Sequence, residues 1–230
     1  MILVINTSTR QFCVGIVSET GALISEYILS PNKGGSSYLM PAISFLIKHS
    51  CKDLKEISCV AVTIGPGSFT GLKVGLSVAK GICFSLNIPI IGVSSLEALA
   101  IGLPYTELPI TAIIDSRKRE YFFAQFRHEK GRLVKIKGDS YLKIEEFPSL
   151  FSKDCIFVGN DYETQASLIK EYMGDDVILA PSNFWHIRAA NIGAIAVNRL
   201  KESDTDDFVV LEPVYLRAPE IRKNPYRLIN

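Results

Sequence analysis

The chain has few of the residues that metal sites and disulfide frameworks need. Only three histidines occur in 230 residues, and no Cys-x-x-Cys or Cys-x-His pair offers the start of a zinc site. The five cysteines are odd in number, lie far apart and are mostly embedded in apolar runs such as ISCVAV and GICFSL. We therefore expect buried, reduced thiols in a cytoplasmic protein.

An excess of one charge and a long apolar run are also missing. Lys plus Arg number 25 and Asp plus Glu number 24, so a polybasic nucleic-acid coat is excluded while a local basic patch is not. No apolar run reaches the length of about 18 residues that a membrane span requires. The opening MILVINTSTR lacks the basic region and the small-residue cleavage site of a secretory signal. We expect no membrane attachment.

The order of the apolar patterns occurs twice along the chain. Each half predicts three meandering strands, followed by alternating strands and helices. The strands are expected at 2–6, 12–18, 22–29, 57–64, 89–93, 109–115, 120–126, 132–137, 155–159 and 177–180. The helices are expected at 36–50, from the glycines of the segment 63–81 to about residue 86, after Ser94, at 161–173 and at 183–202.

Three antiparallel strands followed by βα units are typical of a ribonuclease-H-like domain. Two such domains in tandem give the architecture of actin, sugar kinases and heat-shock ATPases. The sequence therefore predicts an α/β fold with two ribonuclease-H-like lobes. The N-terminal lobe is expected to comprise residues 1–102 and the C-terminal lobe residues 103–230, with a basic tail at its end.

One segment, TIGPGSFTGLKVGLSVAKG at residues 63–81, contains five glycines between a β-like run and a helix-like run. Such a loop before a helix can bind phosphate through its backbone N–H groups. Its spacing is one residue longer than the dinucleotide fingerprint, and no Gly-Lys-Ser/Thr follows. Gly71, Gly75 and Ala79 instead form a stripe of small side chains, although each helical glycine costs about 1 kcal/mol relative to alanine. Three explanations of these glycines stay open: close packing within the chain, an interface with a partner protein, and phosphate binding.

The same segment carries a resemblance to a known family. GPGSFTGLKVGLSVAKG, followed by IPIIGVSSLEALA, is similar to the bacterial TsaB proteins of tRNA threonylcarbamoyladenosine biosynthesis, which are YeaZ-like members of the glycoprotease-like superfamily. VINTST, YLMPAISFLI, IIDSRKREYFFAQF and EPVYLRAPE resemble further segments of that family, so the resemblance covers nearly the whole chain. It implies a two-lobed, actin-like fold.

The resemblance also implies a function and partners. TsaB proteins take part, as non-catalytic subunits, in modifying the adenosine beside the anticodon of certain tRNAs. They bind a metal-containing catalytic paralogue of the TsaD type with the help of a TsaE-type ATPase, and a homodimer is expected when the chain is alone. The interface helices map to roughly 36–50 and 70–86, and tRNA joins the assembled complex. The expected interface residues are Leu39, Ile43, Gly71, Leu72, Gly75, Val78, Ala79 and Ile82.

Two departures from the family bear on catalysis. Asn6 stands where the family usually has Asp, at a turn that helps position metal and phosphate in active actin-fold enzymes, and a neutral amide cannot supply that charge. The first helix opens with Gly35-Ser36-Ser37 and lacks the His-x-x-x-His pair of the metal-bearing paralogue. We therefore expect no catalytic residue, no metal and no intrinsic cofactor, with ADP or ATP bound only in the assembled complex. The residues expected near that nucleotide are Asn6, Thr7, Ser8, Gly65 and Gly67.

Other hypotheses stay open. An independent actin-fold ATPase or kinase would need an acidic metal-binding cluster, and a metallopeptidase-like glycoprotease would need the missing histidine pair. The basic and aromatic segment 116–132 predicts either contact with tRNA or a hairpin with buried rings. Asp115 is either a catalytic carboxylate or a turn residue beside Arg117. The basic tail 217–230 predicts a flexible end or docking strap, or a contact with RNA.

Overall fold

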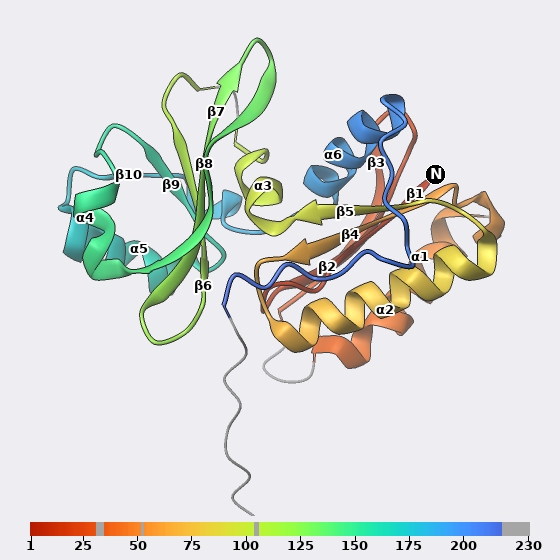
Figure 1. Ribbon diagram of the computed structural model, residues 1–230. Coiled ribbons are helices and arrows are strands. Elements are labelled where there is room, and N and C mark those ends of the chain that lie inside the picture. The colour runs from red at the N-terminus through yellow and green to blue at the C-terminus, as the bar shows by residue number, and fades with distance from the viewer. Residues whose placement is uncertain (31–34, 52, 104–105, 218–230) are drawn as a thin grey trace, which may run out of the picture.

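Two five-stranded sheets form the two lobes of the chain, which lie side by side in Figure 1. The computed structural model describes residues 1–30, 35–51, 53–103 and 106–217. The tail beyond residue 217, for which a docking or RNA-binding role was predicted, therefore lies outside the described residues. The strand order is β3-β2-β1-β4-β5 in the N-terminal sheet and β10-β9-β6-β7-β8 in the C-terminal sheet.

The two sheets have the same topology. The N-terminal sheet contains β1 (Ile2–Asn6), β2 (Phe12–Val17), β3 (Leu23–Leu29), β4 (Cys59–Gly65) and β5 (Ile90–Ser94). The C-terminal sheet contains β6 (Ile110–Asp115), β7 (Glu120–Glu129), β8 (Arg132–Lys143), β9 (Ile156–Val158) and β10 (Ile178–Leu179). In each sheet the first three strands pair antiparallel, and the last two add in parallel beyond the first strand. This repeated order confirms the prediction of two ribonuclease-H-like lobes in an α/β fold.

Helices cover both faces of the N-terminal sheet (Figure 1). These are α1 (Leu39–Ser50) and α2 (Phe69–Leu86), together with α3 (Ser95–Ala100) and α6 (Ala189–Lys201). The remaining α-helices of the described residues are α4 (Phe147–Leu150) and α5 (Tyr162–Met173). Leu3 and Ile5 of β1 belong to the core under α1 and α2. Because side chains alternate along a strand, Ile2 and Val4 face the opposite side, in the core that includes α3 and α6. The central strand β1 is therefore buried on both faces, as its unbroken apolar run indicates.

Two helices pack across the boundary between the halves of the sequence. α6 follows the C-terminal sheet along the chain but packs against the strands of the N-terminal sheet, whereas α3 contacts β6 and β7 of the C-terminal sheet. The approach of α6 needs glycine, because a Cβ atom on Gly193 would lie 2.7 Å from the Val17 side chain. The boundary expected between residues 102 and 103 stays a prediction, since each sheet is covered in part by a helix from the other half.

The composition of α2 follows from its position. Among the described residues α2 is the one helix that is long and apolar enough, by length and composition, to cross a membrane. The core helix of a globular protein meets the same criterion, and here Leu72, Leu76 and Ala79 are buried against the N-terminal sheet. This packing accounts for part of its hydropathy, while Phe69 and Phe84 of the same helix are exposed.

The last helix begins later than its periodicity predicts. The pattern predicted a helix over 183–202, but the observed helix begins at Ala189. Trp185 is fully buried and its Nε1 donates to the carbonyl oxygen of Ala180 at 2.8 Å, so the chain turns there before the helix begins. Glu26 of β3 then accepts a hydrogen bond from the backbone N–H of Ala189 and forms an ion pair with Arg188. A buried indole and a distant carboxylate thus set this boundary, and neither is visible in local periodicity.

We predict that Glu26→Ala lowers the free energy of unfolding by about 2–3 kcal/mol, because it removes a charged acceptor from the first turn of α6 and leaves Arg188 without this partner. The Glu26 side chain is only 5% exposed in this pair. Urea unfolding followed by circular dichroism measures the change. Glu19→Ala is the matched control, because Glu19 is exposed and its contacts, with the chain N-terminus and the Ser58 hydroxyl, lie at the surface. Equal, small losses for the two variants would contradict the role assigned to Glu26.

Candidate functional site

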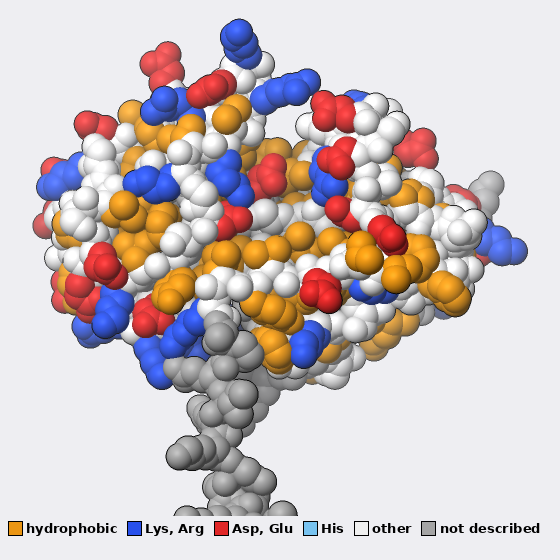
Figure 2. Space-filling view, in the orientation of Figure 1, with side chains coloured by type: hydrophobic (Ala, Val, Ile, Leu, Met, Phe, Trp, Pro, Cys, Tyr) orange, Lys and Arg blue, Asp and Glu red, His pale blue; other side chains and the backbone are white. Residues whose placement is uncertain are grey.

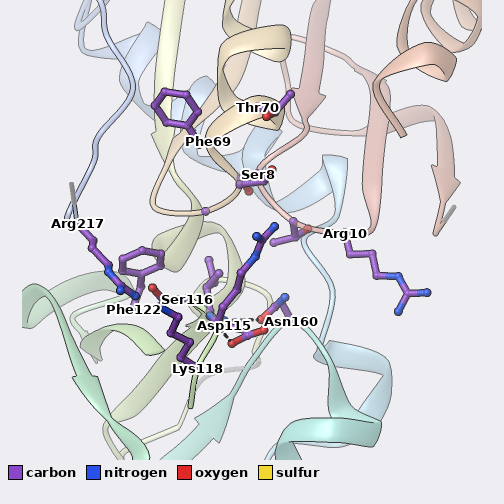
Figure 3. A pocket seen from close by; sticks show the side chains of 15 residues that line it. Ser8, Arg10, Phe69, Thr70, Asp115, Ser116, Lys118, Phe122, Asn160 and Arg217 are labelled. Atoms are coloured by element: carbon purple, nitrogen blue, oxygen red, sulfur yellow. Dashed lines mark hydrogen bonds between the residues drawn. The ribbon is translucent and has the colours of Figure 1, made fainter. Parts of the chain in front are cut away.

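A cleft of about 680 Å³ lies between the two lobes. Its N-terminal wall comes from the β1–β2 turn and the start of α2, and its C-terminal wall comes from the end of β6 and the β6–β7 turn. Figure 3 shows Ser8, Phe69 and Thr70 facing Asp115, Ser116 and Asn160 across this space. The other labelled side chains are Arg10, Lys118, Phe122 and Arg217. We call this space the inter-lobe cleft.

The glycines of the segment 63–81 allow α2 to contact the β1–β2 turn. A Cβ atom on Gly67 would collide with the carbonyl oxygen of Ser8, and one on Gly71 would collide with the carbonyl oxygen of Thr7. A Cβ atom on Gly75 would collide with the Thr7 hydroxyl. Hydrogen bonds hold this contact, from the Ser68 N–H to the Ser8 oxygen and from the Thr7 hydroxyl to the Gly71 oxygen, both at 2.7 Å. Of the three explanations for the glycines, packing within the chain accounts for these positions.

Gly65 makes room for the segment that follows α6, residues 203–217, which we call the strap. Gly65 has φ +118°, and a Cβ atom there would lie 2.7 Å from the carbonyl oxygen of Val214. The Val214 N–H donates to the Ile64 oxygen at 2.7 Å, and the ring of Tyr215 lies 5.0 Å from that of Phe69. Beyond these contacts Arg217 forms an ion pair with Glu120 of β7. The strap therefore crosses the N-terminal lobe and ends at the C-terminal wall of the inter-lobe cleft.

Asn6 is buried and uses its polar atoms inside the chain. Its Oδ1 accepts from the Ser8 N–H at 3.1 Å, from the Ser8 hydroxyl at 2.8 Å and from the Thr63 hydroxyl at 3.0 Å. Its Nδ2 donates to the Gln11 oxygen at 3.4 Å. These bonds fix the turn but leave Asn6 away from the cleft surface. Of the five residues predicted to lie near a nucleotide, Ser8 and Gly67 line the cleft, whereas Asn6, Thr7 and Gly65 do not.

Asp115 shapes the turn on the opposite wall. Its Oδ1 accepts from the backbone N–H of Arg117 at 2.8 Å, and its own N–H donates to Asn160 Oδ1 at 3.1 Å. Asn160 in turn exchanges hydrogen bonds with Gln165. These contacts agree with the hypothesis that Asp115 is a turn residue beside Arg117.

The aromatic residues of the segment 116–132 are buried. Four rings of β7 are at most 8% exposed, those of Tyr121, Phe122, Phe123 and Phe126. Burial is also the main reason that the pKa of Tyr121 rises to about 12. These rings pack in the core of the C-terminal lobe, so the buried-hairpin interpretation holds for them, although Phe122 also lines the inter-lobe cleft.

The expected partner-interface residues mostly face inward. Leu39, Ile43, Leu72, Gly75 and Ala79 are buried within the chain, and Gly71, Val78 and Ile82 are half-buried. Within the stripe, Gly71 and Gly75 have Thr7 of the same chain as their neighbour. Contact of the expected residues with a partner stays a prediction.

Other side chains are exposed on the same two helices. Met40 and Phe45 of α1 are 54% and 53% exposed, and Phe84 of α2 is 76% exposed. Sequence reasoning missed these three because helical periodicity identifies the larger apolar face, which packs on the sheet. The only local signal for them was that a large apolar side chain stands on the side of each helix that is otherwise polar.

The described residues that could bind a metal ion or act as thiol nucleophiles are few and mostly buried. Among the described residues no group of three His, Cys, Asp or Glu side chains is placed to bind a metal ion. All five cysteines are free, and all but Cys51 are buried. Burial raises the pKa of Cys83 to about 11 and that of Cys59 to about 12, so these thiols stay protonated at neutral pH.

We predict opposite effects for two glycine-to-alanine changes in α2. Gly71→Ala should lower the free energy of unfolding by about 2–3 kcal/mol, because the new methyl group meets the backbone of Thr7. Gly81→Ala should raise it by about 0.5–1 kcal/mol, because nothing lies within 4 Å of its Cβ position and alanine favours the helix. Urea denaturation of both variants tests the contact. A stable Gly71→Ala variant would show that the β1–β2 turn does not need this glycine.

Comparisons with known proteins agree with this architecture. The family described as TsaD, tRNA N6-adenosine threonylcarbamoyltransferase, matches residues 25–224. A protein named tRNA threonylcarbamoyladenosine biosynthesis protein TsaB from Bacillus subtilis is 28% identical over 95% of each chain. The protein of the same name from Escherichia coli is 28% identical over 94% of each chain.

Solved structures show the same fold. YeaZ from Pseudomonas aeruginosa superposes with a TM-score of 0.76 at 23% identity, covering 94% of this chain and 99% of the other. A putative N-acetylmannosamine kinase from Listeria monocytogenes superposes more distantly, with a TM-score of 0.51 at 9% identity over 87% of this chain and 99% of the other. Taken with the sequence matches, the chain belongs to the TsaD family and is a TsaB-type, YeaZ-like member of it.

Proposed function

We propose that this chain is a non-catalytic subunit required for the N6-threonylcarbamoyl modification of the adenosine next to the anticodon of tRNA. It acts in the cytoplasm by binding and supporting a catalytic paralogue of the TsaD type. The observation that carries the proposal is the similarity to proteins named for this biosynthesis, which extends over about 95% of this chain and of its relatives.

The geometry at Asn6 supports a non-catalytic role. An actin-fold enzyme needs a group at this turn that can help position metal and phosphate. Here the amide oxygen accepts three hydrogen bonds from Ser8 and Thr63, and the side chain carries no charge. On the facing wall the Asp115 carboxylate holds the β6–β7 turn. The polar side chains of Asn6 and Asp115 thus form hydrogen bonds that hold their own turns.

The exposed apolar side chains of α1 and α2 support a partner surface. Exposed apolar groups that gather on neighbouring elements often mark sites of protein association. Met40, Phe45 and Phe84 project from the two helices on which the resemblance places the interface. We propose that this surface binds the catalytic paralogue and forms a homodimer when the chain is alone. A TsaE-type ATPase, tRNA, and ADP or ATP would join the assembled complex.

A second candidate is an independent actin-fold ATPase or kinase. The volume of the inter-lobe cleft, about 680 Å³, favours it, because small-molecule sites commonly occupy about 300–1,000 Å³. The neutral, internally bonded Asn6 opposes it. ATP hydrolysis by the purified chain alone, at an enzyme-like rate, would favour this candidate over the first. A glycoprotease has no comparable support in the described residues.

We predict that Met40→Glu and Gly81→Glu prevent co-purification with the catalytic paralogue and lower the threonylcarbamoyladenosine content of tRNA in cells that depend on the variant. Both positions are exposed, and a Cβ atom at Gly81 meets nothing within 4 Å, so a charge there should block association without disturbing the fold. Gly75→Leu would be a poor test, because its side chain would collide with Thr7 inside the chain.

Tyr141→Glu is the matched control for these variants. Tyr141 is 47% exposed on β8 of the other lobe, so the same charge enters away from α1 and α2. Circular dichroism establishes that each variant is folded. Normal assembly and normal modification with folded Met40→Glu and Gly81→Glu would refute the proposed interface. A wild-type chain that neither binds the paralogue nor supports modification would refute the proposed function itself.

A further inference from the structure

The β6–β7 turn presents consecutive basic side chains in an unfavourable backbone conformation. Arg117, Lys118 and Arg119 have φ angles of +72°, +56° and +61°. Non-glycine residues in this left-handed region each cost roughly 1–2 kcal/mol. Two hydrogen bonds hold the start of the turn, from the Arg117 N–H to Asp115 Oδ1 and from the Asp115 N–H to Asn160 Oδ1.

Basic residues from distant parts of the sequence converge around the inter-lobe cleft. Arg117 and Lys118 line it together with Arg10 from the β1–β2 turn and Arg217 at the end of the strap. Among the described lining residues Asp115 is the one carboxylate, and its Oδ1 accepts the Arg117 N–H. Arg217 is balanced by its ion pair with Glu120. The described lining thus holds four basic side chains and one carboxylate.

This concentration is local. The whole chain has a net charge of only +1. On the face drawn in Figure 2, Lys and Arg side chains lie among Asp and Glu side chains without a continuous basic field. A positive lining between the lobes thus does not follow from a generally basic surface.

The exposure of these cations favours an extended anion over a small enclosed one. Arg10, Arg117 and Lys118 are all exposed, so they lie at the mouth of the cleft. Figure 3 shows the Arg10 side chain extending away from Asp115 and Lys118. A strand with a phosphate at each nucleotide can contact such separated cations at once, whereas a small ligand usually needs a few enclosed polar groups.

The rings that follow the turn are too buried to contribute much to base stacking. Tyr121, Phe122 and Phe123 follow the turn in sequence but are at most 8% exposed. They offer little surface on which unpaired bases could stack, and the more exposed ring of the cleft, Phe69, belongs to the facing wall. Contact through this turn would therefore involve phosphates and would be independent of base sequence.

We propose that the mouth of the inter-lobe cleft binds the sugar–phosphate backbone of RNA, with Arg117 and Lys118 as its principal contacts and Arg10 at its far rim. The inference rests on the proposed function, which supplies tRNA as the RNA partner of the assembled complex. It assigns the contact to one end of the basic segment 116–132. The other end, about 30 Å away along the ten residues of β7, takes no part.

The test compares two double variants of the full chain, Arg117→Gln/Lys118→Gln and Arg127→Gln/Lys130→Gln. The second pair is a matched control, because both of its residues are exposed and lie at the opposite end of β7, and Lys130 has φ +49° like Lys118. Each pair removes two positive charges. The probe is an unmodified tRNA transcript with an adenosine next to its anticodon, and binding is measured from low to high salt, with and without the catalytic paralogue.

We expect Arg117→Gln/Lys118→Gln to weaken binding about tenfold at about 0.1 M salt and to reduce the slope of log affinity against log salt by about 1.4–1.8. The control pair should change neither by more than about twofold. Equal losses in both pairs, or no loss in either, would overturn the proposal. So would loss of ADP or ATP binding with tRNA binding unchanged, which would identify a small-nucleotide site instead.

Cellular modification separates this inference from the proposed function. If the wild-type chain supports threonylcarbamoyladenosine formation but RNA binding ignores Arg117 and Lys118, the cleft proposal fails and the subunit role stands. If the wild-type chain does not support modification, the proposed function fails, whatever the binding data show.

Discussion

The contact between the β1–β2 turn and the glycines of α2 is the constraint on which the rest of the N-terminal lobe depends. The backbone of Thr7 and Ser8 approaches Gly67 and Gly71 so closely that no side chain fits between them. This contact directs the start of α2 toward the inter-lobe cleft and holds the small-residue face of the helix against β1. Protein interiors are packed as densely as organic crystals, so a single methyl group there must displace backbone. The glycines thus allow this close contact, and the contact in turn determines which residues of the turn and of α2 line the cleft.

Much of the fold could be predicted from the sequence, because strands buried on both faces read as unbroken apolar runs. The run at 2–6 became the central strand β1, and the repeated order of elements gave two equivalent sheets. The small-residue stripe of α2 was also visible, but its neighbour was not. Close packing requires the same small side chains whether the neighbour is the chain's own turn or another protein. Only the three-dimensional arrangement shows that Thr7 occupies that space.

The cleft was harder to predict, because its residues converge from distant parts of the chain. Arg10, Arg117 and Arg217 lie about one hundred residues apart in sequence and line one space. Periodicity reports only what lies along a single helix or strand. The path of the strap could not be predicted for the same reason. It depends on the absence of a side chain at Gly65 and on an ion pair between Arg217 and Glu120. Each contact joins the C-terminal segment to a different lobe.

The turns of the chain differ in how they reach positive φ, and the difference bears on the cleft. Gly21, Gly131 and Gly174 occupy such positions elsewhere, where glycine adopts them without steric cost. The β6–β7 turn instead holds three successive basic residues there, each at a cost of roughly 1–2 kcal/mol. These side chains are exposed, so core packing does not explain why the chain retains them. Arg117 and Lys118 line the cleft, where the one carboxylate of the described lining is bonded within its own turn, whereas Arg119 donates to the Tyr172 hydroxyl. The turn thus sets two basic side chains at the cleft in a backbone conformation that glycine would adopt at no steric cost, which is the reason to test this position for a function.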